Sequence, residues 1–171
     1  MAPNNNYNNK GNFSQNRNNN GNKGYQNHNN GSAKKEELSI PYNKLTESNY
    51  VDTADEVVKI LEKDKNDNFK LTTSQIRNLL AMTAEILNKI NSSKSGDGSN
   101  PILSPAIVQY LNSFKIRSVY ECGRTPSVKD FINKAYILEH LKELKTINDC
   151  ELFCHYMEAL VAYHRYHGGK D

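Results

Sequence analysis

The chain has no tryptophan and only three cysteines among its 171 residues. An odd and low number of cysteines argues against a framework of disulfide bonds. No apolar run reaches the length of about 18 residues that a membrane-spanning helix needs, and the sequence starts without a recognisable signal peptide. We therefore expect a cytoplasmic protein of the reducing cytosol that does not span a membrane.

Acidic residues are absent from residues 1–35, which are rich in asparagine and glycine. Five basic residues give this segment a charge of +5, and because the whole chain carries +3, the rest carries −2. Any nucleic-acid site in the rest of the chain must therefore be a local basic stripe. The basic residues of the segment are Lys10, Arg17, Lys23, Lys34 and Lys35.

Aliphatic runs are also absent from residues 1–35, and the aromatic residues Tyr7, Phe13 and Tyr25 are too sparse to form a core. Such a segment buries too little apolar surface to offset the entropy lost on ordering, so we expect it to be disordered. The favoured interpretation is a solubilising spacer. The alternative is weak contact with RNA, through basic side chains interleaved with aromatic ones.

Beyond this segment, apolar residues recur at helical spacing, and no stretch alternates as a strand would. We expect an all-α fold, a single bundle of about five helices in a domain of residues 49–171, preceded by a tail and lead-in over residues 1–48. A polar loop over residues 92–100 separates the second helix from the third. The expected helices cover residues 49–63, 72–90, 106–122, 126–145 and 148–167.

Helix caps support these boundaries, because a capping side chain satisfies backbone N–H groups of the first turn. A glycine after the last turn ends a helix, and Gly168 stands in that position. The start signals are Thr72 with Gln75, Ser104 with Pro105, and Asn148 with Glu151.

The junction between the third and fourth expected helices has the features of an anion site. Gly123 after Cys122 predicts a helix end with a left-handed glycine, so Gly123→Val should be destabilising. Thr125 and Pro126 predict the next helix start. Arg124 then lies beside a helix N-terminus, a favourable place for an anion such as phosphate.

Six basic residues are candidates for binding phosphate. On the third expected helix Arg117, Tyr120 and Arg124 fall on one face, and only Glu121 opposes the basic residues nearby. The plain alternative is that these side chains offset a helix dipole or pair with acids such as Asp130. We expect Tyr120 to belong to the core, with a stacking surface as the alternative. The candidates are Arg77, Lys115, Arg117, Arg124, Lys129 and Lys134.

Catalytic motifs are missing from the sequence, including the phosphate-binding loop, the dinucleotide fingerprint and the metalloprotease helix. One cluster of metal-ligand residue types lies on a single expected helix, and its ends are more than about 20 Å apart at about 1.5 Å per residue. One ion cannot bind at both ends, so we expect buried structural cysteines, no metal, no cofactor and no enzymatic activity. The cluster is Cys150, Cys154, His155, His164 and His167.

Three separated blocks of the sequence match the pattern of a known family. They are LTTSQIRNLL at residues 71–80, SFKIRSVYECGR and VKDFINKA within 113–135, and FCHYMEALVAYHRYHGGKD at 153–171. In this order they resemble the small subunit of the type III-A (Csm) CRISPR effector complex. The resemblance extends from about residue 49 to the last residue of the sequence. Residues 1–35 and the loop over 92–100 have no counterpart in the family pattern.

The resemblance implies an all-helical, non-catalytic protein whose copies stack beside the Csm backbone subunits that hold the guide crRNA, in antiviral and anti-plasmid defence. It also implies that basic residues face the groove where guide RNA pairs with target RNA. Target cleavage would belong to the backbone subunits, and cyclic-nucleotide and DNA chemistry to the large signature subunit. The first block contains Arg77 and the second contains Lys115, Arg117 and Arg124, and these four are the favoured contacts.

Two other functions stay open. A helical protein–protein adaptor with merely solvated basic residues would show no salt-dependent binding to RNA. A metal nuclease would need a carboxylate cluster, which the spread of acids along the expected helices does not indicate. These acids are Asp130, Glu139, Glu143 and Glu158.

Deletion of residues 1–35 should leave folding intact, because their composition offers nothing to bury. We expect the helical circular dichroism of the remaining chain and its melting temperature to stay nearly unchanged. A fall of many degrees in melting temperature would show that the segment packs against the helical domain.

Overall fold

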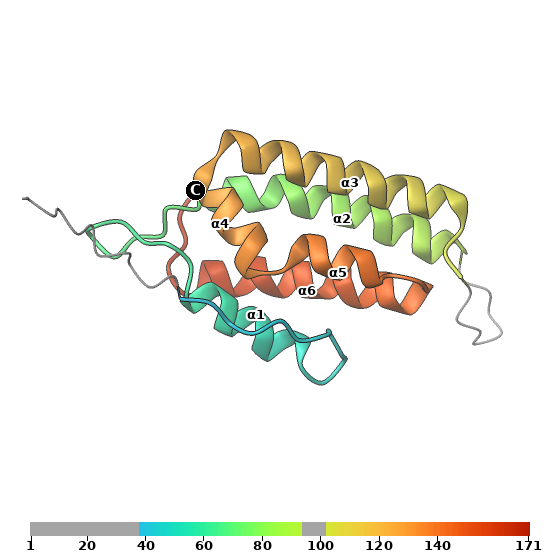
Figure 1. Ribbon diagram of the computed structural model, residues 1–171, viewed down its shortest axis with the longest axis horizontal. Coiled ribbons are helices and arrows are strands. Elements are labelled where there is room, and N and C mark those ends of the chain that lie inside the picture. Colours follow the sequence, from blue (N-terminus) through green and yellow to red (C-terminus); the bar gives the residue numbers. More distant parts are fainter. Residues whose placement is uncertain (1–37, 94–101) are drawn as a thin grey trace, which may run out of the picture. The chain divides into compact units, whose positions relative to one another are not determined.

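A computed structural model describes residues 38–93 and 102–171. These residues form six helices and, apart from two isolated backbone bridges, no strand, which confirms the expected all-α class (Figure 1). The expected tail over residues 1–35 and most of the expected loop over 92–100 lie outside the described residues. The helices are α1 (Tyr50–Lys59), α2 (Thr73–Ser93), α3 (Pro105–Arg124), α4 (Pro126–Lys134), α5 (Ile137–Glu143) and α6 (Ile147–Tyr166).

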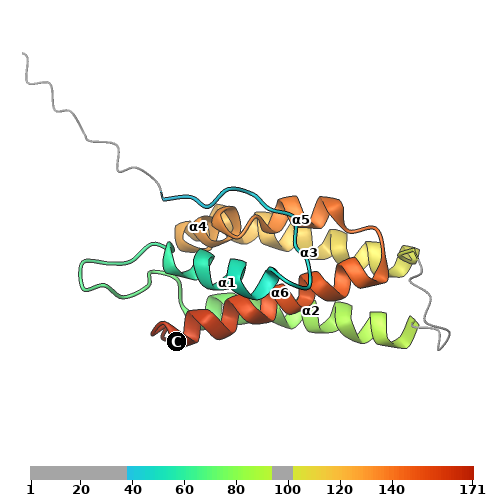
Figure 2. The same cartoon turned by 90° about the horizontal axis from the view of Figure 1, so that it is seen from below.

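Helix α6 forms the centre of the core, with α1 packed along one side and α2 along another (Figure 2). It buries a broad face, and its Phe153 packs edge-to-face against Phe114 of α3, with ring centroids 5.8 Å apart. Each fully buried large side chain contributes roughly 1.5–3 kcal/mol through burial, so α6 holds its neighbours together. The buried residues of α6 are Ile147, Cys150, Phe153, Cys154, Tyr156, Met157, Leu160 and His164.

Two of the predicted helix starts are confirmed. Thr72 N donates to Gln75 Oε1 at 2.9 Å, and Gln75 N donates to Thr72 Oγ1 at 3.2 Å, which makes a reciprocal capping box at α2. At α3, Ser104 Oγ accepts from Ile107 N at 3.4 Å, with Pro105 in the first turn.

The predicted cap of the last helix is wrong by two residues. Thr146 Oγ1 accepts from Asp149 N at 3.2 Å, while Asp149 Oδ2 accepts from Thr146 N at 2.9 Å. This pair forms the capping box in place of Asn148 with Glu151. Both pairs have capping spacing, and burial of Ile147 in the first turn favours the earlier one.

The helix break predicted at Cys122 and Gly123 lies two residues later. Helix α3 continues through Gly123, which has no positive φ angle, and ends at Arg124. Thr125 has an extended backbone, with φ −134° and ψ 105°, and Pro126 follows at the first position of α4. A proline disfavours the helical conformation of the residue before it, so Pro126 sets the break without help from a glycine.

The expected fourth helix over residues 126–145 is divided into α4 and α5, which accounts for the sixth helix. Tyr136 between them is left-handed, with φ 49° and ψ 34°. This conformation costs roughly 1–2 kcal/mol in a residue other than glycine. Contacts with the lead-in offset that cost, because Tyr136 Oη donates to Ile40 O at 2.7 Å and its ring packs 5.3 Å from that of Tyr42.

The segment after α6 folds back onto the start of α2. Gly168 turns the chain with φ +94°, and Lys170 O accepts a hydrogen bond of 2.8 Å from the first residue of α2. The buried His164 donates from Nε2 to Leu71 O at 3.0 Å. Gly169 lies so close to His164 that a Cβ atom there would collide with the ring and come within 2.6 Å of the His164 carbonyl oxygen.

Gly123→Ala and Gly169→Ala should have opposite effects on the stability of the protein. Nothing lies within 4 Å of a Cβ atom built at Gly123. Gly123→Ala should therefore stabilise the protein by about 0.5–1 kcal/mol, the usual gain inside a helix. Gly169→Ala should destabilise it by more than about 1 kcal/mol, because the new Cβ meets His164. Urea unfolding followed by circular dichroism measures both changes, and a destabilised Gly123→Ala variant would contradict the continuous α3.

Two buried histidines, His140 and His164, lead us to expect stability that falls in mild acid. Burial lowers the pKa of His140 to about 4 and also lowers that of His164. Each ring stays neutral in the folded chain, whereas the unfolded chain takes up a proton below about pH 6.5. The folded pKa lies below the unfolded one, so this stabilisation is complete above about pH 6.5 and declines as the pH falls toward the folded pKa.

Urea unfolding at about pH 7.5 and about pH 5 tests this expectation. The free energy of unfolding should fall by at most roughly 2 kcal/mol for each histidine over that range. His140→Gln should show a smaller fall than the unsubstituted chain, with the remainder due largely to His164. If His140→Gln kept the full pH dependence, other groups would be responsible for it.

Candidate nucleic-acid interface

The start of α2, the end of α3 and the start of α4 meet at one end of the helical unit (Figure 1). Helices α2 and α3 run antiparallel, which puts Arg77 of α2 at the end where α3 finishes. Ser127 Oγ of α4 donates to Gln75 Oε1 of α2 at 3.3 Å, so the first turns of these two helices are in contact. Candidate residues from three helices are therefore gathered at one end of the unit.

An exposed cluster of two arginines and a tyrosine occupies the last turns of α3. The guanidinium carbons of Arg117 and Arg124 lie 5.6 Å and 5.4 Å from the ring centroid of Tyr120, within range of a cation–π interaction. The sequence placed these three residues on one face, and the structure confirms this. Tyr120 is 54% exposed, so the expectation that it belongs to the core is wrong. We refer to these residues as the Arg-Tyr-Arg cluster.

Glu121 lies between the two arginines of the cluster. Its Oε1 atom is 2.8 Å from Arg117 Nη2 and 3.7 Å from Arg124 Nη1. The Glu121 side chain is 14% exposed, whereas those of Arg117 and Arg124 are 48% and 59% exposed. The sequence expectation that these arginines are nearly unopposed is therefore wrong, because one carboxylate contacts both of them.

Arg77 forms an exposed ion pair, with Nη1 3.4 Å from Asp171 Oδ1. Both side chains are more than half exposed, and such pairs contribute little to stability. The guanidinium of Arg77 is therefore free to exchange one anionic partner for another. The hydrogen bond between Lys170 O and the start of α2 brings Asp171 to this position.

Lys115 and Lys129 are exposed, and no described carboxylate lies within ion-pairing distance of either amino group. Lys115 precedes Arg117 by two residues, which on a helix directs the two side chains to different sides. Lys129 lies on α4, one turn beyond its start. The structure thus brings Lys129 toward the junction and leaves Lys115 on another side of α3.

Lys134 is a structural residue, which corrects its selection as a candidate contact. Its amino group lies 2.7 Å from Asp130 Oδ1, and the two side chains are 9% and 10% exposed. The same amino group donates to Ile60 O at 2.9 Å, and Asp130 Oδ2 accepts from Glu62 N at 3.0 Å. This pair binds α4 to the chain after α1, which ends at Lys59 and not at the predicted residue 63.

The start of α4 lies where the sequence predicted a helix start beside Arg124. Thr125 makes no side-chain capping hydrogen bond, and Pro126 occupies the first turn. Arg124 lies directly before this start, as the sequence indicated. The positive end of the α4 dipole therefore adds to the charge of the Arg-Tyr-Arg cluster.

The cysteines and histidines of the expected last helix are distributed among separate contacts. Burial raises the pKa of the Cys150 thiol to about 12 and that of Cys154 further, so both thiols stay protonated. His155 lies 3.2 Å from Glu158, and His167 lies 2.6 Å from Asp55 of α1. Within residues 38–93 and 102–171, no three potential metal ligands of these types come together.

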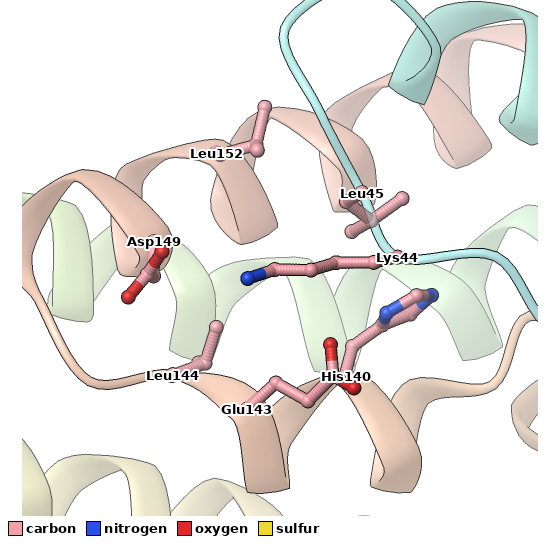
Figure 3. Close-up of a pocket in the computed structure, with 7 residues that line it drawn as sticks. All are labelled: Lys44, Leu45, His140, Glu143, Leu144, Asp149 and Leu152. Atoms are coloured by element: carbon pink, nitrogen blue, oxygen red, sulfur yellow. The ribbon is translucent and has the colours of Figure 1, made fainter.

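A small pocket lies between the lead-in, α5 and α6, with the Lys44 side chain lying across it toward Asp149 (Figure 3). Its volume of about 20 Å³ is close to that of one water molecule, which is too small for a substrate. His140 in its wall is buried and neutral, and Asp149 caps α6. The pocket is therefore a small surface depression between packed elements. In the described part of the chain, no helix is long and apolar enough to cross a membrane.

Sequence reasoning missed the contacts of the segment after α6. His164 and Gly169 direct this segment onto the start of α2, where Asp171 forms its exposed pair with Arg77. The only sequence signal was the pair of glycines after a helix, which predicts a turn but not its partner. The sequence interpretation also underestimated Glu121. Helix geometry places residue 121 about one turn from both Arg117 and Arg124, so contact with both could have been expected.

Comparison with known proteins identifies related sequences. A family model described as Csm2 Type III-A matches residues 44–170. The CRISPR system Cms protein Csm2 of Streptococcus thermophilus is 45% identical over 127 residues, which cover 74% of this chain and 98% of the relative. Its counterpart in Mycobacterium tuberculosis H37Rv is 39% identical over 126 residues, which cover 73% of this chain and 96% of that protein.

A protein of the same description from Enterococcus italicus is 34% identical over 104 residues, which cover 59% of this chain and 71% of the relative. The matched family region includes all six candidate residues and begins after the asparagine-rich segment.

Proposed function

Because this chain belongs to the Csm2 family, the small subunits of type III-A CRISPR (Csm) complexes, we propose that its exposed arginines contact the RNA held in that complex. The ligand is the backbone of guide crRNA paired with target RNA. The contacts go to phosphate oxygens and do not read the base sequence. The Arg-Tyr-Arg cluster at the end of α3 is the observation that carries this proposal.

Arginine suits this role because its planar guanidinium donates two parallel hydrogen bonds to one phosphate. Arg117 and Arg124 are about half exposed, and so is Arg77 at the same end of the unit. Outside residues 1–35 the chain carries a net charge of −2. Attraction to RNA must therefore come from a local group of basic residues such as this one. The first turn of α4 adds a partial positive charge beside it.

The proposed contact set is smaller than the one read from the sequence. Arg77, Arg117 and Arg124 form its centre, and Lys129 lies beside them on α4. Lys115 is retained as a contact on another side of α3. Lys134 is left out, because a buried amino group paired with Asp130 is not accessible to phosphate.

We further propose that the subunit has no catalytic activity and acts in the cytoplasm. Its partners would be the Csm backbone subunits, the large signature subunit and neighbouring copies of itself. Family membership supports this assignment. The dispersal of cysteines, histidines and acids into structural contacts in the described residues supports it as well.

Exposed apolar residues on α3 favour a second candidate function, that of a protein–protein adaptor. Val108, Ile116 and Val119 are 41%, 70% and 52% exposed on the side of α3 that faces away from the core. Exposed apolar groups of this kind are typical of surfaces that meet another protein. An adaptor would bind its partners normally after the arginines are removed, and RNA affinity would not change.

Replacing Arg77, Lys115, Arg117 and Arg124 with alanine should weaken target-RNA binding by a reconstituted Csm complex. Each lost phosphate contact should lower the slope of log affinity against log salt by about 0.7–0.9. Two unrelated target sequences, each with its own guide, should lose affinity equally. Titration with fluorescent RNA at several salt concentrations measures both quantities.

A matched control separates local contact from loss of charge. Arg117→Ala with Arg124→Ala removes two charges, and so does Lys142→Ala with Lys145→Ala at the other end of the unit (Figure 1). Only the arginine pair should change the salt slope. Wild-type affinity and slope in the fourfold variant would reject RNA contact and favour the adaptor.

A further inference from the structure

Glu121 is an unusual neighbour for an RNA contact, since its negative charge opposes phosphate. A single oxygen of this carboxylate approaches both guanidiniums of the Arg-Tyr-Arg cluster, at 2.8 Å and 3.7 Å. The Glu121 side chain lies underneath, 14% exposed, while the arginines extend into solvent. The carboxylate is thus placed to hold the arginines, and it is less accessible to an incoming RNA than they are.

Tyr120 restrains the same two arginines from the solvent side. Arg117 precedes it by three residues and Arg124 follows it by four, so the ring lies between them along the helix. Both guanidiniums lie within 5.6 Å of the ring centroid. Each arginine therefore has two contacts, one with the carboxylate and one with the aromatic ring.

We propose that Glu121 and Tyr120 are positioning residues for the phosphate contacts of Arg117 and Arg124, an inference that rests on the RNA-binding function proposed above. A free arginine side chain loses rotamer freedom when it binds phosphate, and this loss weakens binding. In the cluster that freedom is already lost on folding. The gain from this preorganisation exceeds the repulsion between Glu121 and RNA, because Glu121 is partly buried and its charge is shared by two cations.

The sign of the effect of Glu121→Gln tests the proposal. If Glu121 acted only through its charge, removing that charge would raise the affinity of the reconstituted Csm complex for target RNA. If Glu121 positions the arginines, Glu121→Gln should lower the affinity, because a neutral amide holds a guanidinium less firmly than a carboxylate does. We expect a loss of about three- to tenfold, with a larger loss in Glu121→Ala.

Asp171→Asn is the matched control. It removes the same charge from a carboxylate that also pairs with a candidate arginine, Arg77, but that pair is exposed and holds no second arginine. This variant should keep or raise the affinity. Opposite effects of Glu121→Gln and Asp171→Asn support positioning, and a rise in both would overturn it.

Two substitutions of Tyr120 test the contribution of its aromatic ring. Tyr120→Phe keeps the ring and should retain affinity, whereas Tyr120→Leu removes it and should lower affinity by about two- to fivefold. The salt slope should fall in Glu121→Ala by up to about 1, as a phosphate contact is lost. A change in stability alone leaves this slope unchanged, so melting temperatures measured in parallel separate the two effects.

The two proposals can fail separately. If Arg117→Ala and Arg124→Ala leave affinity unchanged, RNA contact itself is rejected. If these substitutions weaken binding while Glu121→Gln and Tyr120→Leu do not, RNA contact stands and positioning is rejected. Should Glu121→Ala fail to assemble, the isosteric Glu121→Gln and the exposed Tyr120→Leu still decide the question.

Discussion

The side chains of α6 are buried between α1 and α2, and the other described helices depend on that packing. Helices of fewer than about 12 residues are marginal in water, and α1, α4 and α5 have ten, nine and seven residues. They exist because their apolar stripes are covered by a common core. The left-handed Tyr136, which separates α4 from α5, is likewise held by contact with the lead-in.

The same packing positions the candidate interface. His164 near the end of α6 bonds to Leu71 and leaves room only for glycine at position 169, which directs the following residues onto the start of α2. On the far side of α2, antiparallel pairing brings the end of α3 to the same place. Basic residues that lie far apart in the sequence are therefore placed at the same end of the helical unit by packing and not by attraction between charges.

Basic residues in this chain have two different roles. The buried Lys134 holds α4 to the chain after α1 through Asp130 and Ile60, whereas Arg117 and Arg124 remain at the surface with one shared carboxylate. The distinction is one of solvation, because the partners of a buried cation enclose it, whereas an exposed cation stays accessible to a further anion. The sequence therefore contains more basic residues than the folded protein exposes for contact with RNA.

By itself, the sequence determined the all-α class, the caps of α2 and α3, the common face of Arg117, Tyr120 and Arg124, and the family. These depend on local spacing, which helix geometry converts directly into position. Only the tertiary structure decided that α3 runs through Gly123, that Tyr136 breaks a helix, and that Lys134 is buried while Tyr120 is exposed. Each of these depends on which residues of distant segments come into contact, and that is set by the packing of α6 and the lead-in and not by neighbours along the chain.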